Sequence, residues 1–204
     1  MTTRNLMIIP LGLLLFGYVA TSQAGAADIA QPERSAANDA LIENALSAAP
    51  ANVASGATVK TPDGAVLREG NNGWVCLPDH ASQPGNSPRC LDPQYQALMK
   101  ALQQKTQPQV ERVGFAYMLQ GGKPGSDTNP FATGPNDPGT WHATPRLPHI
   151  MVVVPDTEDL SGLPTQPGSG GPWVMWSDTP YAHLMIPVAS SEPADPPLAP
   201  LKSR

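Results

Sequence analysis

Apolar residues recur along the chain at two spacings, one typical of a helix face and the other of short strands. From Ser35 to Ala49 they keep the spacing of one helix face. A second helical stripe runs to about Gln104, and Asp92-Pro93 before it supplies the residues of a helix N-cap and first turn. The sequence therefore predicts two helices.

The remaining apolar runs are short and rich in β-branched and aromatic residues. They predict strands at 58–61, 65–69, 74–77, 113–119, 150–154, 173–176 and 181–188. Pro62-Asp63-Gly64 predicts a hairpin between the first two strands. The link at 177–180 is too short for a helical crossover, so the last two strands should pair antiparallel. Residues 120–146 are predicted to form a long loop, anchored by Phe131 and Trp141.

The composition agrees with a sheet joined by many turns. The 204 residues include 25 Pro and 18 Gly, which interrupt regular structure and exclude a helical bundle or a long coiled coil. We expect an α+β fold, with an antiparallel or mixed sheet, about two helices, long Pro/Gly-rich loops and one disulfide. The formal net charge of -5, without a Lys/Arg cluster, argues against binding to nucleic acid.

The N-terminus has the pattern of an export signal. Residues 6–20 carry no charge and are too few for a membrane span, which needs about 20 residues. Small residues then offer cleavage after Ala24 or Ala26, and an uncleaved anchor is the alternative. We expect a periplasmic or extracellular protein with no stable membrane span after cleavage. The predicted organisation is a signal peptide at 1–26, a flexible leader at 27–34, a single domain at 35–188 and a disordered tail at 189–204.

The two cysteines, Cys76 and Cys90, enclose a segment with three prolines and little apolar periodicity. In an oxidising compartment such a pair is expected to form a structural disulfide. The alternatives are two free thiols or a cysteine-based metal site, although the spacing matches neither a zinc pattern nor a C-x-x-C motif.

Common catalytic and ion-binding motifs are missing from the sequence. Residues 168–171 lack the spacing of a serine nucleophile elbow, which leaves Ser169 in a glycine-rich connection. Residues 121–126 lack the Walker spacing. Four residues with side-chain oxygens lack the register of an EF-hand and are interpreted as turn formers: Asp127, Asn129, Asn136 and Asp137. The sequence names no catalytic residue and favours a protein that is not an enzyme.

A His-x-Met pattern occurs twice, as His149-Ile150-Met151 and His183-Leu184-Met185, each time in a predicted strand. Residues i and i+2 of a strand point to the same face, so each pair presents an imidazole beside a thioether. Such ligands suit Cu(I), and Met118 and Met175 could add further sulfur. The alternative is that these methionines pack the core of the sheet.

The aromatic residues offer a third interpretation, a shallow face for a sugar or a peptide. Trp173 and Trp176 differ by three positions, so along one strand they should face opposite sides. The other residues considered for this face are Trp74, Trp141, Tyr117 and Tyr181. Ordinary packing is the alternative.

Several segments of the sequence together resemble those of a known protein family. They are 72–79, 84–86 with 90–92, 114–122, 127–133, 148–152 and 179–188. The set resembles a family of uncharacterised exported bacterial proteins over roughly residues 35–188. The resemblance implies a bacterial, exported protein and no particular activity, cofactor or site residue.

We therefore expect an exported bacterial protein that serves as a non-catalytic structural or binding module of the cell envelope. A periplasmic copper-binding protein that uses the two His-x-Met pairs is the second hypothesis, and an enzyme with an unidentified active site is the third. Whether His149, Met151, His183 and Met185 converge in space separates the second hypothesis from the others.

Overall fold

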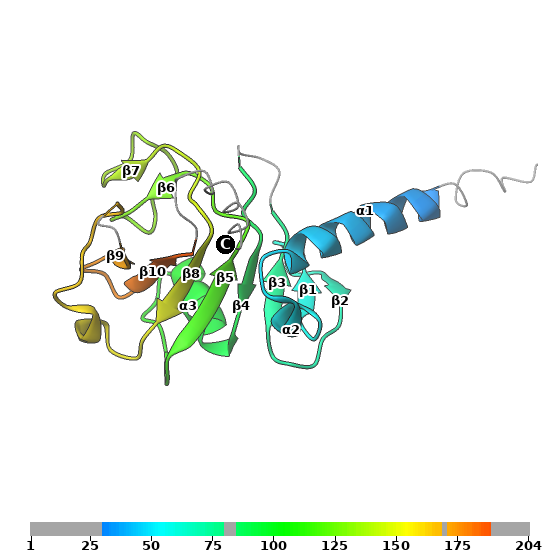
Figure 1. The fold of residues 1–204 in the computed structure, drawn as a ribbon, viewed down its shortest axis with the longest axis horizontal. Helices are drawn as coiled ribbons and strands as arrows, with labels where there is room; N and C mark the ends of the chain where they lie inside the picture. The colour runs from blue at the N-terminus through cyan, green and yellow to red at the C-terminus, as the bar shows by residue number, and fades with distance from the viewer. Residues whose placement is uncertain (1–29, 80–84, 169–170, 189–204) are drawn as a thin grey trace, which may run out of the picture. The chain divides into compact units, whose positions relative to one another are not determined.

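The computed structural model describes residues 30–79, 85–168 and 171–188 (Figure 1). The chain divides into two compact units, residues 1–35 and 36–204. Of the first unit only the start of helix α1 (Ala30–Leu46) is described. The predicted signal peptide and C-terminal tail lie outside the described residues, and the fold below is that of the second unit.

The second unit is built on a mixed sheet of eight strands in the order β2-β1-β3-β4-β5-β8-β10-β9. Their bounds are β1 Thr58–Lys60, β2 Val66–Arg68, β3 Val75–Leu77, β4 Arg89–Leu91, β5 Gly114–Met118, β8 His149–Val153, β9 Trp173–Met175 and β10 His183–Pro187. The β1–β3 pair is parallel and every other pair in this sheet is antiparallel. Together with the helices, this sheet confirms the predicted α+β fold.

Helix α3 (Pro93–Gln104) covers the middle of one face of the sheet, behind β5 and β8 (Figure 1). The side chain of Asp92 caps it by accepting a hydrogen bond from the backbone N–H of Tyr95 at 2.8 Å, as the sequence predicts. The helix ends at Lys105, which takes a left-handed conformation. Tyr95 and Leu98 point from α3 into the core.

The opposite face of the sheet carries a second core around the disulfide. Cys76 and Cys90 lie directly opposite each other on β3 and β4 and are bonded, with an S–S distance of 2.02 Å. This confirms the predicted bridge and leaves no free cysteine in the chain. Small side chains near the end of α1, including Ala45 and Ala48, pack against it together with Val59 of β1.

Two shorter helical segments and a small second sheet complete the described fold, and none of them was predicted. They are α2 (Ala51–Ala54), the 3-10 turn η1 (Thr157–Leu160), and a two-stranded sheet of β6 (Gly125–Ser126) and β7 (Trp141–His142). Helix α1 also starts at Ala30, before the expected Ser35. Short elements of this kind depend on tertiary contacts more than on local periodicity.

The long segment 120–146 is held by polar groups as well as by its aromatic residues. Phe131 is 43% exposed, and its ring meets that of Tyr181 edge-on with centroids 5.6 Å apart, while Trp141 is partly buried. Polar groups fix the segment further, because Asp127 is buried and forms an ion pair with Arg146 at 2.6 Å. The indole N–H of Trp176 also donates to the carbonyl oxygen of Ser126 at 2.9 Å.

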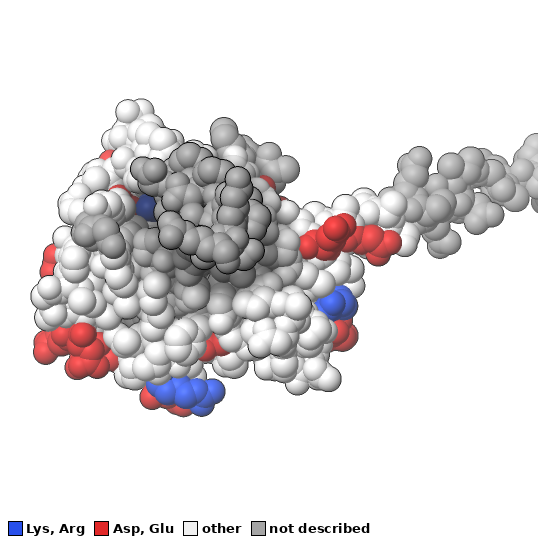
Figure 2. Space-filling model, viewed as in Figure 1, with Lys and Arg blue, Asp and Glu red and all other residues white. Residues whose placement is uncertain are grey.

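None of the described helices is long and apolar enough to cross a membrane. On the face shown in Figure 2, the described Lys and Arg side chains stand beside acidic ones and form no basic patch.

Candidate functional site

The four residues of the His-x-Met pairs lie on one face of the sheet. Met151 of β8 is directly opposite Met185 of β10, so their side chains point to the same side. His149 and His183 are two positions away on the same strands and share that face. It is the face covered by α3, because Met151 and Met185 pack in one core with Leu98.

Neighbouring strands add two more methionines to this face. Met118 of β5 is opposite His149, and Met175 of β9 is opposite His183. The six side chains line a cavity of about 270 Å³ beneath α3, which we call the Met/His cavity. Four thioethers and two imidazoles thus come from four neighbouring strands: Met118, His149, Met151, Met185, His183 and Met175.

His183 is the most enclosed polar group of this cavity, with 1% of its surface exposed. Its Nδ1 donates to the carbonyl oxygen of Tyr181 at 3.0 Å, because a carbonyl only accepts. The lone pair is therefore on Nε2, which is buried and has no hydrogen-bond partner. Burial lowers the pKa of His183 to about 4, so the ring is neutral at physiological pH.

Aromatic rings fix the orientation of this imidazole. The rings of Trp176 and Tyr95 meet it edge-on, with centroids 4.9 and 5.9 Å away. The hydroxyl of Tyr95 donates to the sulfur of Met151 at 3.2 Å, which also places that thioether. One cavity thus contains both a buried imidazole lone pair and thioether side chains.

His149 lies at the other end of the same two strands. Its Nδ1 donates to the carbonyl oxygen of Leu147 at 2.6 Å, and burial lowers its pKa. Because His149 is opposite Pro187, four residues from His183 along β10, the two histidines are separated by roughly 13 Å of strand. The four predicted residues therefore share one cavity, in which Met151 and Met185 lie between the two histidines. Met175 is opposite His183, and Met118 is opposite His149.

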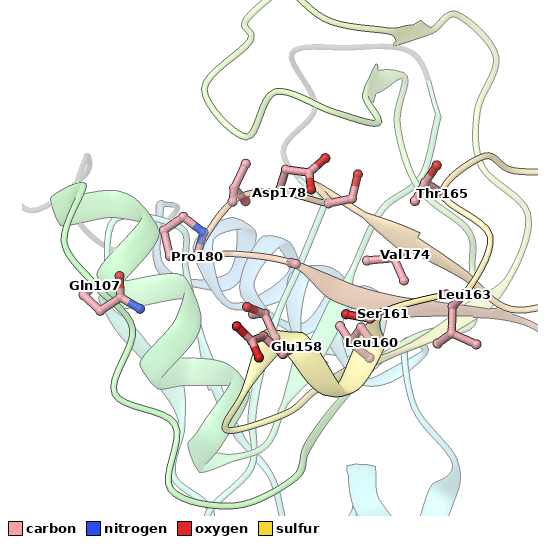
Figure 3. A pocket seen from close by; sticks show the side chains of 14 residues that line it. Gln107, Glu158, Leu160, Ser161, Leu163, Thr165, Val174, Asp178 and Pro180 are labelled. Atoms are coloured by element: carbon pink, nitrogen blue, oxygen red, sulfur yellow. The ribbon is translucent and has the colours of Figure 1, made fainter.

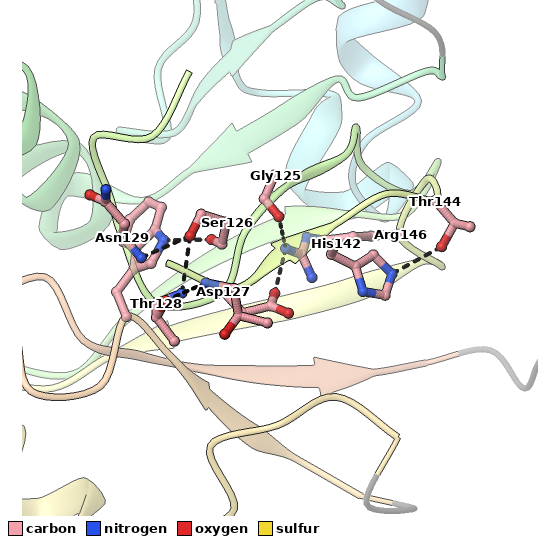
Figure 4. A network of polar contacts seen from close by, with 10 residues as sticks. Gly125, Ser126, Asp127, Thr128, Asn129, His142, Thr144 and Arg146 are labelled. Carbon is pink, nitrogen blue, oxygen red and sulfur yellow. Dashed lines mark hydrogen bonds and ion pairs between the residues drawn. The ribbon is translucent and has the colours of Figure 1, made fainter. Parts of the chain in front are cut away.

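Two arginines also line the Met/His cavity. The guanidinium of Arg146 is neutralised by Asp127 and donates to the carbonyl oxygen of Gly125 at 3.2 Å (Figure 4). Its other neighbour is Trp173, whose ring centroid lies 5.6 Å away. Arg89 of β4 has no such acidic partner, and its Nε is buried without a hydrogen bond.

The residues considered for calcium do not gather into one site. Asp127 is committed to Arg146, and Asp137 accepts from the backbone N–H groups of Thr133 and Gly134. Asn129 accepts from the N–H of Phe131, as an Asx turn does. These contacts agree with the interpretation as turn formers for Asn129 and Asp137, whereas Asp127 forms an ion pair. Ser169 lies outside the described residues.

The aromatic residues do not form a common face either. Trp74 packs against Tyr117 on the disulfide side of the sheet, with centroids 5.5 Å apart. Trp173 lies on the side of the Met/His cavity. Trp176 also reaches that cavity, so the expectation that Trp173 and Trp176 face opposite sides is wrong. The reason is local, since β9 ends at Met175 and Trp176 takes a positive φ of 56°.

A larger cavity of about 530 Å³ lies between η1 and the turn that joins β9 to β10 (Figure 3). Its wall contains Glu158, Asp178 and loop side chains, and no histidine or methionine. The buried side-chain atoms without a hydrogen bond in the described part of the chain belong to Arg89 and His183, and both line the Met/His cavity. The smaller cavity is therefore the better candidate for a site.

Comparison with known proteins gives no family for this chain: no family model, curated protein or solved structure matches it. Within the described residues, no three side chains of His, Cys, Asp and Glu are grouped so as to hold a metal ion. A metal in the Met/His cavity would therefore need methionine sulfur among its ligands.

The sequence pointed to the methionines and histidines of this cavity but missed Arg89, Tyr95 and Trp176. Tyr95 belongs to a helical stripe that reads as ordinary core. The short strand that carries Arg89 was not predicted, so nothing placed its side chain on the inner face. Trp176 depends on a left-handed backbone that a tryptophan rarely adopts.

Proposed function

We propose that this chain is an exported bacterial protein of the cell envelope, a non-catalytic binding module, and that it binds Cu(I) in the Met/His cavity. The observation that carries the metal proposal is the buried Nε2 of His183, a lone pair with no hydrogen-bond partner among methionine side chains. A buried polar atom without a partner is costly, and a bound ligand removes that cost.

The chemistry of the side chains selects a soft ion. Thioether and imidazole are the ligands that suit Cu(I), whereas Mg²⁺ and Ca²⁺ take oxygen ligands. The cluster around His183 offers Nε2 together with the sulfurs of Met175, Met185 and Met151. These ligands bind in the neutral form, so Cu(I) does not have to displace a proton at neutral pH.

The side chains have the freedom that binding needs. Methionine is unbranched and rotates about three bonds, so its sulfur can turn toward a metal while the strands stay in place. The strands themselves are fixed by pairing on both sides, since β8 lies between β5 and β10, and β10 lies between β8 and β9. A rigid sheet that presents adaptable sulfur ligands is suited to binding.

Two features support the export part of the proposal. The uncharged run at 6–20 followed by small residues has the pattern of a cleaved signal peptide. The Cys76–Cys90 disulfide is of the kind that persists in oxidising compartments. The resemblance to exported bacterial proteins points the same way.

The test is an anaerobic titration of the purified protein with Cu(I), in competition with a chromophoric Cu(I) chelator. We expect one equivalent to bind and the Met175→Leu and Met185→Leu variants to lose at least tenfold in affinity, about 1.4 kcal/mol each. Leucine is close to methionine in volume, so the fold should remain intact.

Met118→Leu is the matched control, because Met118 lies beside His149 at the far end of the cavity. It should leave the affinity of the first equivalent unchanged. Failure of the protein to compete for Cu(I), or equal affinity of Met175→Leu, Met185→Leu and the unmodified protein, would overturn the proposal.

A further inference from the structure

Arg89 supplies a positive charge that forms no ion pair with an acidic side chain of the described structure. Its side chain lines the Met/His cavity from β4, and its buried Nε has no hydrogen-bond partner. The ion pairs of the described residues involve other cations, Lys123 with Asp79 and Arg146 with Asp127. The uncompensated charge stands out because the whole chain has a net charge of -5.

Asp79 is the acidic side chain that acts on the charge of Arg89, but it is already bound by other groups. Its Oδ1 accepts from Lys123 at 3.0 Å and from the hydroxyl of Ser87 at 2.9 Å. Asp79 therefore only moderates the charge of Arg89 from a distance, while burial lowers the pKa of the guanidinium. Arginine nevertheless stays protonated in proteins, so the charge remains.

The burial of the guanidinium Nε without a hydrogen-bond partner costs free energy. In the same cavity the structure shows how such a cation is normally accommodated, because Arg146 has both Asp127 and a carbonyl oxygen as acceptors (Figure 4). At Arg89 the corresponding acceptor is missing among the described residues. An anion from solution would take that place.

We propose that the Arg89 end of the Met/His cavity binds a small carboxylate ligand with an apolar body. The planar guanidinium can give two parallel N–H bonds, from Nε and one terminal nitrogen, to the two oxygens of a carboxylate. The single charge of the guanidinium balances the single negative charge of a carboxylate.

The wall next to Arg89 specifies the rest of the ligand. Met99 and Met118 line the same cavity with apolar surface that adapts in shape. A volume of about 270 Å³ is small for a ligand pocket. It suits a short-chain or single-ring carboxylate.

The carboxylate site is distinct from the proposed Cu(I) site. Arg89 is on β4 and His183 on β10, three strands apart, which is roughly 14 Å across the sheet. The Arg89→Met variant should therefore keep its affinity for Cu(I). The two proposals can fail separately.

The experiment is calorimetric titration of the metal-free protein with hexanoate and benzoate, and with methyl benzoate and inorganic phosphate for comparison. We expect saturable binding of at least one carboxylate, no binding of the neutral ester, and weaker binding of phosphate. Arg89→Met should lower carboxylate affinity at least tenfold. Arg112→Met, which removes an exposed arginine, should leave it unchanged.

A second measurement separates a binding role of Arg89 from a structural one. In the absence of ligand, Arg89→Met should keep or raise the melting temperature, because it removes an unpaired buried charge. A lower melting temperature for the ligand-free variant would show that Arg89 stabilises the fold and would overturn the proposal. Equal carboxylate affinity of Arg89→Met and the unmodified protein, or no saturable binding of either carboxylate, would also overturn it.

Discussion

At the residue scale, the environment of His183 makes the stability of the metal-free protein depend on pH. Its ring is buried between Trp176 and Tyr95 and cannot be charged without loss of solvation. A histidine in the unfolded chain takes up a proton near pH 6.5, whereas His183 in the fold does so only at about 4. Between these values the unfolded state binds more protons than the native state.

The metal-free protein should therefore lose stability as the pH falls from 6.5 to 4, by about 3 kcal/mol from this residue. His183→Leu should remove most of that dependence, and His142→Leu, which replaces a partly buried histidine of β7, serves as the control. Urea unfolding at pH 7 and pH 4.5 measures the difference. Parallel pH profiles for His183→Leu and the unmodified protein would contradict the expectation.

At the scale of the element, one carboxylate joins the covering helix to the sheet. Asp92 accepts from the N–H of Tyr95 at the start of α3 and from the N–H of Phe115 in β5, at 2.8 and 2.9 Å. A single side chain thus caps the helix and fixes its distance from the strand. This connection sets where Tyr95 stands over the cavity.

Asp92→Ala should lower the free energy of unfolding by about 2 kcal/mol, because the cap is lost and the N–H of Phe115 loses its acceptor. Denaturant unfolding at neutral pH measures the loss. Asp63→Ala is the control, since Asp63 lies in an exposed turn. Equal stability of the two variants would show that the carboxylate does not support α3.

Elements with a local signal were predicted well from the sequence. The hairpin of β1 and β2, the capped helix α3 and the antiparallel β9–β10 pair each follow from residues close together in the chain. The position of β5 beside β8 and the parallel β1–β3 pair depend on distant segments, and no local spacing specifies them.

The candidate site was predicted in the same partial way. Alternation in a strand placed each His beside its Met, but the register of Met151 against Met185 required the fold. Arg89 lies on the face of the cavity because it belongs to β4. That strand has only three residues, too few for an alternating pattern to predict it from the sequence.

At the scale of the whole molecule, the disulfide and the Met/His cavity lie on opposite faces of one sheet. Cys90 and Leu91 are adjacent on β4, so one points to the disulfide core and the other to the α3 core. The bridge crosslinks the fold without entering the site. Stability and binding can therefore be separated by mutation.

Replacement of both Cys76 and Cys90 by alanine should lower the free energy of unfolding by about 3 kcal/mol, as expected for a short crosslinked loop. The affinity for Cu(I) should stay the same in protein that remains folded. Denaturant unfolding and the competition titration measure the two quantities. In the unmodified protein, thiol titration after unfolding without reductant should give a value near zero.

The pairing of Met151 with Met185 has a consequence for how such a protein can change over generations. A single residue inserted in β8 or β10 would shift the register by one and turn every ligand on that strand toward the other face. Insertions in the connections between strands would leave the cavity intact. Descendants of this chain should therefore vary freely in loop length. A change in the length of β8 or β10 should occur only in descendants that have also lost the site.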